Sequence, residues 1–248
     1  MLTREEMDRV VVVLVRARNP NNIGAVARAM HDFGFLHLRI VNEYAVPFQS
    51  ARSAVDASAV VAAAVEAGTV AEAVADCTLV VGTTAVGERD LEHPLYELPQ
   101  AGPMLRAEMA RHEGRVALLF GSEKTGLSNE ELSHCNLLMT IPMQQSEGER
   151  HPSMNLGQAA AVCLFELVRK DVSAPITLPP HAAAGDLERL TVLMNEVLEE
   201  SGYSKRHPAN CEPGQIRRLV RRMGMEPQDA PVWMGILRQL LWKLGGKS

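Results

Sequence analysis

The sequence predicts an α/β fold, in which a mostly parallel sheet is covered by helices and followed by a small helical module. Two observations support this prediction. Over residues 1–170, short runs of aliphatic residues alternate with longer helical stretches, the pattern of parallel strands joined by helices. Residues 171–185 are rich in proline and alanine, and only helical patterns follow them.

The expected strands are short and rich in valine, leucine and isoleucine, which favours buried positions in a sheet. They span residues 10–15, 37–41, 79–81, 116–120 and 137–141. Helical patterns fall between them, at residues 23–33, 54–67, 70–75, 104–112, 129–135 and 154–170. The last of these is apolar almost all round, so we expect it to be buried on most sides, including a subunit interface.

We therefore expect a first domain over residues 1–170, a linker over residues 171–185 and a helical module over residues 186–248. The expected helices of the module span residues 187–200, 215–223 and 232–244. The chain has a net charge of −5, yet residues 201–248 hold nine Lys and Arg against three Asp and Glu. A basic module on an acidic body suits a nucleic-acid partner, although a solvated helix face remains the alternative.

The four cysteines have no spacing typical of a zinc site or a disulfide framework, so we expect no bound metal. Cys77 and Cys163 lie in apolar runs and are expected to be reduced core residues. The chain opens with charged residues, and its apolar runs are too short to cross a bilayer. We expect a soluble cytoplasmic protein that does not contact a membrane.

The first candidate motif is NPNNIGAVARAM, residues 19–30, which follows the first strand. Its asparagines supply amide donors and acceptors in a turn, and Gly24 lets a helix begin close to that turn. Arg28 lies one helical turn after Gly24 and is expected to reach the same site. The alternative is an Asn-Pro turn that only caps the helix.

The second motif is GSEKTGLSNEEL, residues 121–132, directly after the strand at residues 116–120. Loops at the carboxyl ends of parallel strands are where α/β sheets bind ligands. Ser128 and Glu131 have the spacing of a capping box, which is a structural feature. Glu123 is the candidate functional group, because its carboxylate can orient Arg28; the alternative is a solvated loop acid.

The third motif is TIPMQQSEGERHPSMNLGQAAAV, residues 140–162. Here a strand ends, a polar loop follows, and Ser153 and Asn155 stand at the beginning of the apolar helix. Ser153 as a helix N-cap is the structural alternative. Two polar side chains at the start of an alanine-rich helix, beside a ligand loop, indicate a functional role as well.

In their order and separation, the three segments resemble the motifs of the SpoU/TrmH group of SPOUT methyltransferases. The resemblance covers residues 10–170. The run from residue 213 to 241 resembles the C-terminal extension of the TrmJ subgroup, as do residues 51–60 and 82–94 of the body. The matched positions are Asn22, Gly24, Arg28, Gly121, Glu123, Gly126, Leu127, Ser153, Asn155 and Leu156.

The resemblance implies a trefoil-knotted sheet, a homodimer, and S-adenosyl-L-methionine (SAM) bound against three loops, leaving S-adenosyl-L-homocysteine as product. The basic module is expected to bind RNA phosphates through Arg217, Arg218, Arg221 and Arg222, whose i, i+4 spacing forms two stripes. The implied SAM-binding residues are Thr83, Thr84, Ala85, Gly121, Glu123, Gly126, Ile141, Pro142, Ser153, Met154 and Leu156.

The implied reaction is methyl transfer to a ribose 2′-hydroxyl of tRNA, at the anticodon-loop pyrimidine in position 32. Arg28 would contact the 2′-oxygen or the adjacent phosphate and assist deprotonation, and Glu123 would orient Arg28. Asn22 and Asn155 would position the reacting groups, and Ser153 would support the loop. The loop at residues 143–152 is longer and more charged than is usual in the TrmJ subgroup, which leaves the target nucleotide open. The alternatives are an rRNA 2′-O-methyltransferase and a non-catalytic RNA-binding SPOUT module.

Overall fold

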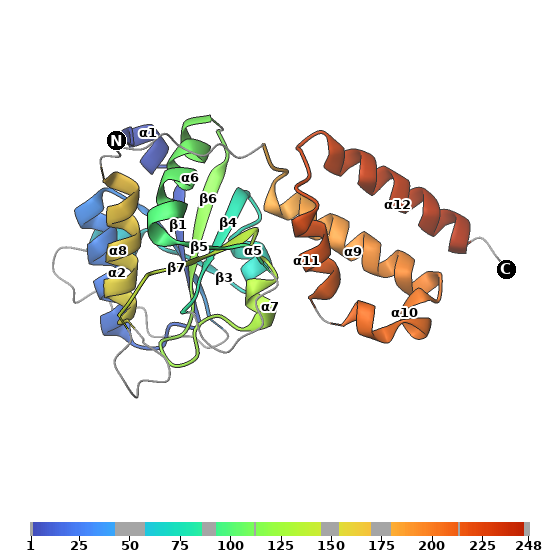
Figure 1. The fold of residues 1–248 in the computed structure, drawn as a ribbon, viewed down its shortest axis with the longest axis horizontal. Coiled ribbons are helices and arrows are strands. Elements are labelled where there is room, and N and C mark those ends of the chain that lie inside the picture. Colours follow the sequence, from blue (N-terminus) through green and yellow to red (C-terminus); the bar gives the residue numbers. More distant parts are fainter. Residues whose placement is uncertain are drawn as a thin grey trace.

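The computed structural model of the chain describes residues 2–42, 58–85, 93–111, 113–144, 154–169, 180–212 and 214–245. Strands in these ranges form one seven-stranded sheet, in the order β3-β2-β1-β6-β4-β7-β5, and every pairing in it is parallel (Figure 1). The strands are β1 (Val10–Val15), β2 (His37–Val41), β3 (Val65–Ala67), β4 (Cys77–Thr83), β5 (Leu95–Glu97), β6 (Arg115–Phe120) and β7 (Leu137–Thr140).

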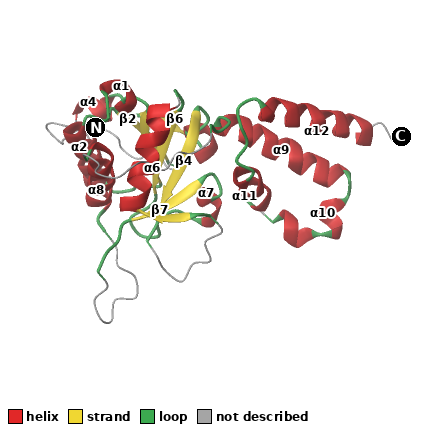
Figure 2. Ribbon diagram, turned by 45° about the horizontal axis from the view of Figure 1, so that its top comes forward, coloured by secondary structure: helices red, strands yellow, loops and turns green. Residues whose placement is uncertain are grey.

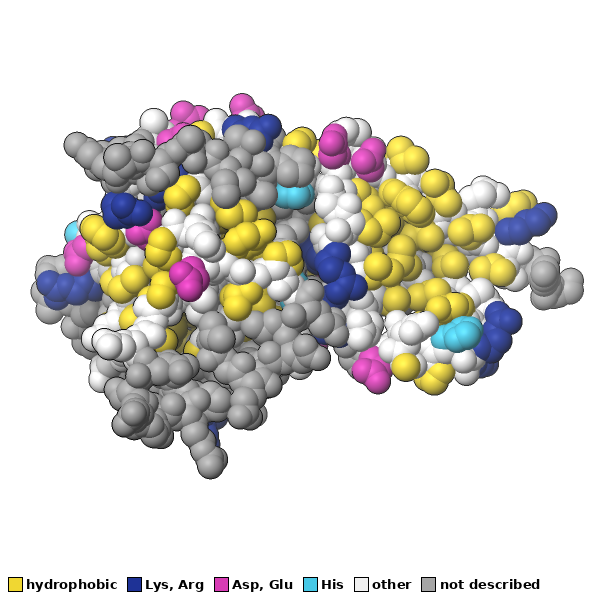
Figure 3. All heavy atoms as spheres, viewed as in Figure 1, with side chains coloured by type: hydrophobic (Ala, Val, Ile, Leu, Met, Phe, Trp, Pro, Cys, Tyr) yellow, Lys and Arg dark blue, Asp and Glu magenta, His cyan; other side chains and the backbone are white. Residues whose placement is uncertain are grey.

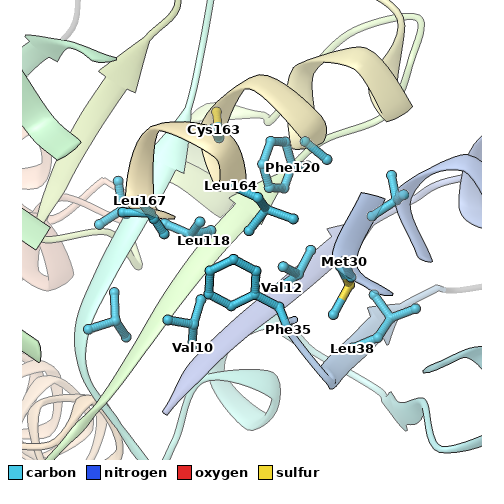
Figure 4. Packing of buried hydrophobic residues seen from close by; sticks show 14 of the residues in the cluster. Val10, Val12, Met30, Phe35, Leu38, Leu118, Phe120, Cys163, Leu164 and Leu167 are labelled. Carbon is cyan, nitrogen blue, oxygen red and sulfur yellow. The ribbon is translucent and has the colours of Figure 1, made fainter. Parts of the chain in front are cut away.

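Helices cover both faces of the sheet. Alternate residues of a strand point to opposite sides, so the central strands contribute to a buried cluster on each face. Val10, Val12 and Leu14 of β1 belong to one buried cluster. Figure 4 shows part of this cluster, with Val10 and Val12 labelled. Val11, Val13 and Val15 belong to the cluster on the other face. The first cluster includes residues of α2 (Pro20–Phe33), α4 (Ser58–Ala62), α6 (Leu98–Arg111) and α8 (Leu156–Val168); the second includes residues of α5 (Val70–Ala73) and α7 (Asn129–Leu132).

The predicted α/β class and five of the strands are confirmed, with β1 and β2 at the predicted bounds. One expected element was wrong, and another begins earlier than expected. Residues 54–67 were expected to be one helix, but the described part holds a short α4 followed by β3, which pairs with β2 at the sheet edge. The helix predicted at residues 104–112 begins earlier, at Leu98, and includes Pro103 within it. A short α1 (Arg4–Met7) precedes β1.

Beyond the sheet, the chain forms a helical module with its own core, seen beside the sheet in Figures 1 and 2. Its core joins Leu187 and Leu190 to Val220 and Leu237. Figure 3 shows hydrophobic side chains over much of the visible face of the module. Its elements are α9 (Ala184–Glu200), α10 (Tyr203–Arg206), a 3-10 turn (Pro208–Cys211), α11 (Gln215–Arg222) and α12 (Asp229–Gly245).

The described end of the predicted linker is packed. Ala182 is buried in the core of the module, whereas Ala184 is buried against the sheet. The backbone N–H of Gly185 donates a hydrogen bond to the carbonyl of Ala75 at 2.8 Å, and a Cβ at Gly185 would lie 2.6 Å from that oxygen. Residues 171–179 of the expected linker lie outside the described residues, and the division into domains stays a prediction.

The topology brings together the ends of strands that are far apart in sequence. Strands β1, β6, β4 and β7 are consecutive neighbours and parallel, so their carboxyl ends meet at one edge of the sheet. The segments that follow these four ends are those predicted to carry the site. None of the helices in the described ranges is long and apolar enough to cross a membrane.

Candidate active site

A chain of hydrogen bonds joins the three predicted motifs. The side-chain nitrogen of Asn155 donates to Oδ1 of Asn22 at 3.1 Å, and the side-chain nitrogen of Asn22 donates to Oε1 of Glu123 at 2.9 Å. Asn155 is the N-cap of α8, because its Oδ1 accepts from the backbone N–H groups of Gly157 and Gln158 at 2.9 and 3.4 Å. The structure thus brings together Asn22, Glu123 and Asn155, as the sequence predicted.

Local sequence fixes the position of Asn22. Asn19 caps α2 by accepting a hydrogen bond from the N–H of Asn21 at 3.0 Å, and Pro20 is the first residue of the helix. Proline suits this position because its missing N–H would have no helical partner there. The asparagines that we expected in a turn therefore lie at the helix start, and Asn22 faces the Glu123 loop from its first turn.

Glu123 is negatively charged at neutral pH. Partial burial acts to raise the pKa of its carboxyl group, but hydrogen bonds from the Asn22 amide and from nearby backbone groups outweigh burial and lower this pKa. Arg28 lies on the same helix as Asn22 and is exposed. The proposed pairing of Glu123 with Arg28 stays a prediction.

The glycine-bounded loop, from Gly121 to Gly126, is closed by its own backbone. The N–H of Gly126 donates to the carbonyl of Ser122 at 2.7 Å, and Gly126 adopts a left-handed φ of 66°. A Cβ at Gly121 would lie 2.2 Å from the carbonyl carbon of Gly126 and from the nitrogen of Leu127. Both glycines are among the SAM-binding residues that the resemblance implies, and the structure shows that Gly121 makes room for the returning loop.

The other predicted SAM loops begin at the neighbouring strand ends. The hydroxyl of Thr83 donates to the carbonyl of Leu119 at 2.8 Å, and the N–H of Thr84 donates to the carbonyl of Met139 at 3.0 Å. These bonds fix the end of β4 against β6 and β7. The remaining positions lie beside them in the chain, with Ala85 and Pro142 exposed, Ile141 and Met154 half-buried, and Leu156 buried.

Ser153, predicted as both a catalytic and a SAM-binding residue, lies outside the described residues, as does most of the charged loop at residues 143–152.

Sequence reasoning missed Arg16, the residue directly after β1. Its guanidinium binds the carboxylate of Glu131 and the carbonyl oxygen of Gly126, at 2.5 Å from Nε to Oε1 and 3.1 Å from Nη2 to the carbonyl. A basic residue after a buried strand is an ordinary surface pattern, so no signal in the sequence distinguished it. The capping box that we predicted from Ser128 and Glu131 is confirmed.

The module arginines differ in their exposure. Arg217 binds Glu188, Glu130 and the hydroxyl of Ser133, at 2.8 to 3.0 Å. Arg221 is only 4% exposed, and burial lowers the pKa of its guanidinium to about 10. The stripe formed by Arg217 and Arg221 therefore faces the protein. RNA binding by the four arginines stays a prediction. Arg222 is exposed and Arg218 is half-buried.

The buried cysteines are structural. Cys77 and Cys163 are free and buried, as predicted, and so is Cys135. Burial raises the pKa of each thiol to about 12, so all three are protonated near neutral pH. Within the described ranges, no group of three or more His, Cys, Asp or Glu is placed to hold a metal ion.

Comparisons with known proteins agree with this architecture. Residues 9–165 match the SpoU rRNA Methylase family. The tRNA (cytidine/uridine-2′-O-)-methyltransferase TrmJ of Yersinia enterocolitica is 32% identical, over 94% of this chain and 92% of the relative. TrmJ of Salmonella typhimurium is 31% identical over 97% of this chain and all of the relative.

The fold has solved counterparts. The crystal structure of TrmJ from Z. mobilis superposes with a TM-score of 0.78 at 28% identity, covering 93% of this chain and 98% of the other. A putative methylase family protein from Neisseria gonorrhoeae gives 0.59 at 31% identity, covering 72% and 90%. The chain belongs to the SpoU rRNA methylase family, and it is related over nearly its whole length to TrmJ methyltransferases.

Proposed function

We propose that this protein is a SAM-dependent methyltransferase that methylates the ribose 2′-hydroxyl of a tRNA nucleotide, the anticodon-loop pyrimidine at position 32. The observation that carries this proposal is the hydrogen-bonded chain of Asn155, Asn22 and Glu123 beside the closed glycine loop. The named activity of the TrmJ relatives, at over 90% coverage of both chains, supports the tRNA substrate.

The residues at this edge of the sheet fit SAM. The ends of β4, β6 and β7 present exposed loop residues, including Ala85, Gly126 and Pro142, whose backbone groups suit the adenosine and amino-acid portions. The charged carboxylate of Glu123 suits a cationic ligand such as a sulfonium. When bound, SAM supplies the methyl group from its sulfonium.

The protein's own residues must hold the ribose and stabilise the 2′-oxygen as its proton passes to solvent. An arginine is protonated at neutral pH and is therefore a poor general base. Arg28 instead stabilises negative charge that develops on the 2′-oxygen. Glu123 orients Arg28. The amide of Asn22 holds Glu123, and the amide of Asn155 in turn holds Asn22. We assign Ser153 the role of supporting the loop.

We also propose that the chain is knotted after β7. Strand β7 lies beyond β6 and β4 from β1, yet α8, the next described element, packs against α2 beside β1. The approach is close, because a Cβ at Gly157 of α8 would lie 2.5 Å from the Cβ of Ala25 in α2. The return of the chain across four strands supports a threaded path.

The apolar surface of α2 and α8 supports a homodimer. We expected α8 to be buried on most sides, but in the single chain Phe165 is 50% and Val162 37% exposed. Phe165 packs against Phe33 of α2, with ring centroids 6.1 Å apart and the ring planes tilted by 59°. Leu36, just beyond α2, is 47% exposed. An exposed apolar patch of this kind marks an interface, and we propose that a second copy covers it.

The proposed function is tested by mapping 2′-O-methylated nucleotides by mass spectrometry, in tRNA and rRNA from cells with and without the gene. We expect loss of one methylation in the tRNA anticodon loop, consistent with action in the cytoplasm. Loss of a ribosomal methylation instead would favour the rRNA alternative. An unchanged map, together with no methyl transfer by the purified protein, would favour the non-catalytic RNA-binding alternative.

A further inference from the structure

Arg16 has an unusual backbone conformation. It follows β1 directly and has a φ of 55°, in the left-handed region that residues other than glycine rarely adopt. Its own N–H is bound, donating to the carbonyl of Val41 at 2.8 Å. A strained residue persists only where its surroundings hold it, and such residues cluster at functional sites.

The side chain of Arg16 holds the glycine loop from β1, the strand beside β6. Its Nε and Nη2 bind the two carboxylate oxygens of Glu131 at 2.5 and 2.9 Å. Nη2 also donates to the carbonyl of Gly126 at 3.1 Å, and Nη1 to the hydroxyl of Thr125 at 3.4 Å. A guanidinium presents several donors in a fixed plane, so these contacts fix direction as well as distance.

Glu131 extends the same network to the far side of the loop. Its carboxylate accepts from the N–H of Ser128 at 2.6 Å, and its own N–H donates to the hydroxyl of Ser128 at 3.2 Å. The side chain of Glu131 is only 9% exposed, so water competes little for this carboxylate. Arg16 and Glu131 therefore fix the loop from Thr125 to Ser128.

We propose that Arg16 is a positioning residue that holds the loop from Gly121 to Gly126 in the conformation that binds SAM. This inference rests on the proposed function, because it assigns SAM to that loop. Arg16 acts through the backbone of Gly126 and through Glu131. Its loss should therefore weaken SAM binding and leave the chemical step largely intact.

The test is Arg16→Gly, because glycine adopts a φ of 55° without strain while removing the guanidinium. We expect the SAM dissociation constant to rise about tenfold, the value of one charge-assisted hydrogen bond. We expect kcat at saturating SAM to change less than about twofold, and the KM for tRNA to stay the same. Arg16→Lys keeps the charge without the planar fork and should fall between the two.

The matched control is Arg39→Gln. Arg39 also makes a two-pronged pair, with Asp76 at 2.5 and 2.8 Å, but on β2 away from the loop. This variant should keep the SAM affinity of the wild type. A second readout is amide hydrogen exchange in the ligand-free protein, which should rise at residues 122–127 in Arg16→Gly and not in the control.

The possible outcomes distinguish a failure of the proposed function from a failure of the positioning role of Arg16. Absence of SAM binding by the wild-type protein would overturn both the proposed function and this inference. If the wild-type protein binds SAM and both Arg16→Gly and Arg16→Lys bind it with the wild-type affinity, the inference alone would be overturned. An equal loss of affinity in Arg39→Gln would assign the effect to general stability, and would overturn the positioning role as well.

Discussion

The side-chain amide of Asn22 donates a hydrogen bond to Oε1 of Glu123 at 2.9 Å, across 101 residues of sequence. Asn22→Asp removes this donor while keeping an acceptor for Asn155, and it places a second carboxylate beside Glu123. The added charge should raise the pKa of Glu123. We expect turnover to fall about a hundredfold, as measured by methyl transfer to tRNA at saturating SAM.

Asn21→Asp is the control for this change, because Asn21 is exposed and lies next to Asn22 in the first turn of α2. A carboxylate there should be tolerated by the helix N-terminus. Near-equal turnover in the two variants would contradict the proposed role of Asn22.

Arg28→Ala should also abolish turnover, while SAM binding and most RNA affinity stay in place.

Three glycine-to-alanine variants separate steric from conformational effects. Gly121→Ala should abolish SAM binding, because its Cβ would lie 2.2 Å from loop backbone. A Cβ at Gly126 would meet no atom within 4 Å, but the residue has a φ of 66°. Gly126→Ala should therefore lower the free energy of unfolding by about 1–2 kcal/mol. Gly235→Ala, in the open on α12, should stabilise by about 0.5–1 kcal/mol.

Urea unfolding and calorimetric SAM titration measure all three variants. Undiminished SAM binding by Gly121→Ala would remove the loop from the proposed site.

Phe165→Asp should convert the proposed homodimer to a monomer, because it places a charge in the apolar patch of α2 and α8. Val232→Asp is the matched control, since Val232 is 61% exposed but lies on α12. Sedimentation at micromolar concentration distinguishes the states. A wild-type monomer with intact activity, or a Phe165→Asp dimer, would refute the proposed interface.

Arg222→Gln should reduce the salt dependence of tRNA binding, because Arg222 is the exposed member of the four arginines on α11. Loss of one phosphate contact should lower the slope of log affinity against log salt by about 0.7–0.9. Arg217→Gln should instead lower the stability of the protein, since it leaves Glu188 and Glu130 without that arginine. An unaltered slope in Arg222→Gln would place RNA docking elsewhere.

The contacts that Glu130 makes, including its ion pair with the module, should stabilise the protein less at acid pH. A hydrogen bond from His134, together with the charge of Arg217, lowers the pKa of Glu130 from 4.5 to about 2. The stabilisation by Glu130 is therefore complete above pH 4.5 and is lost as the pH falls toward 2. Glu130→Gln should flatten this part of the curve of melting temperature against pH. Parallel curves for variant and wild type would contradict it.

Sequence patterns predicted the central strands because strands buried on both faces are continuous aliphatic runs. They missed β3 and β5, which are three residues long and lie at the two edges of the sheet. An alanine-rich stretch favours a helix locally, and only pairing with β2 makes residues 65–67 a strand.

The site was predictable in its residue types and less so in its contacts. The motifs brought Asn22, Glu123 and Asn155 to attention, but their hydrogen-bond order depends on three-dimensional placement. Arg16 was missed because its partner, Glu131, lies 115 residues away. The i, i+4 spacing of the arginines predicted two stripes on α11, but no local pattern predicts that Arg221 is buried against the protein.

The four-residue helix α7 carries two adjacent acidic residues that pair with arginines from different parts of the chain. Glu131 binds Arg16 of the body, and Glu130 binds Arg217 of the module. A truncated protein ending near residue 170 would strip Glu130 of that arginine, and would uncover the sheet surface under Ala184. Domain dissection is thus a poor way to study catalysis in this enzyme, and chimeras that exchange the module should retain an arginine at position 217.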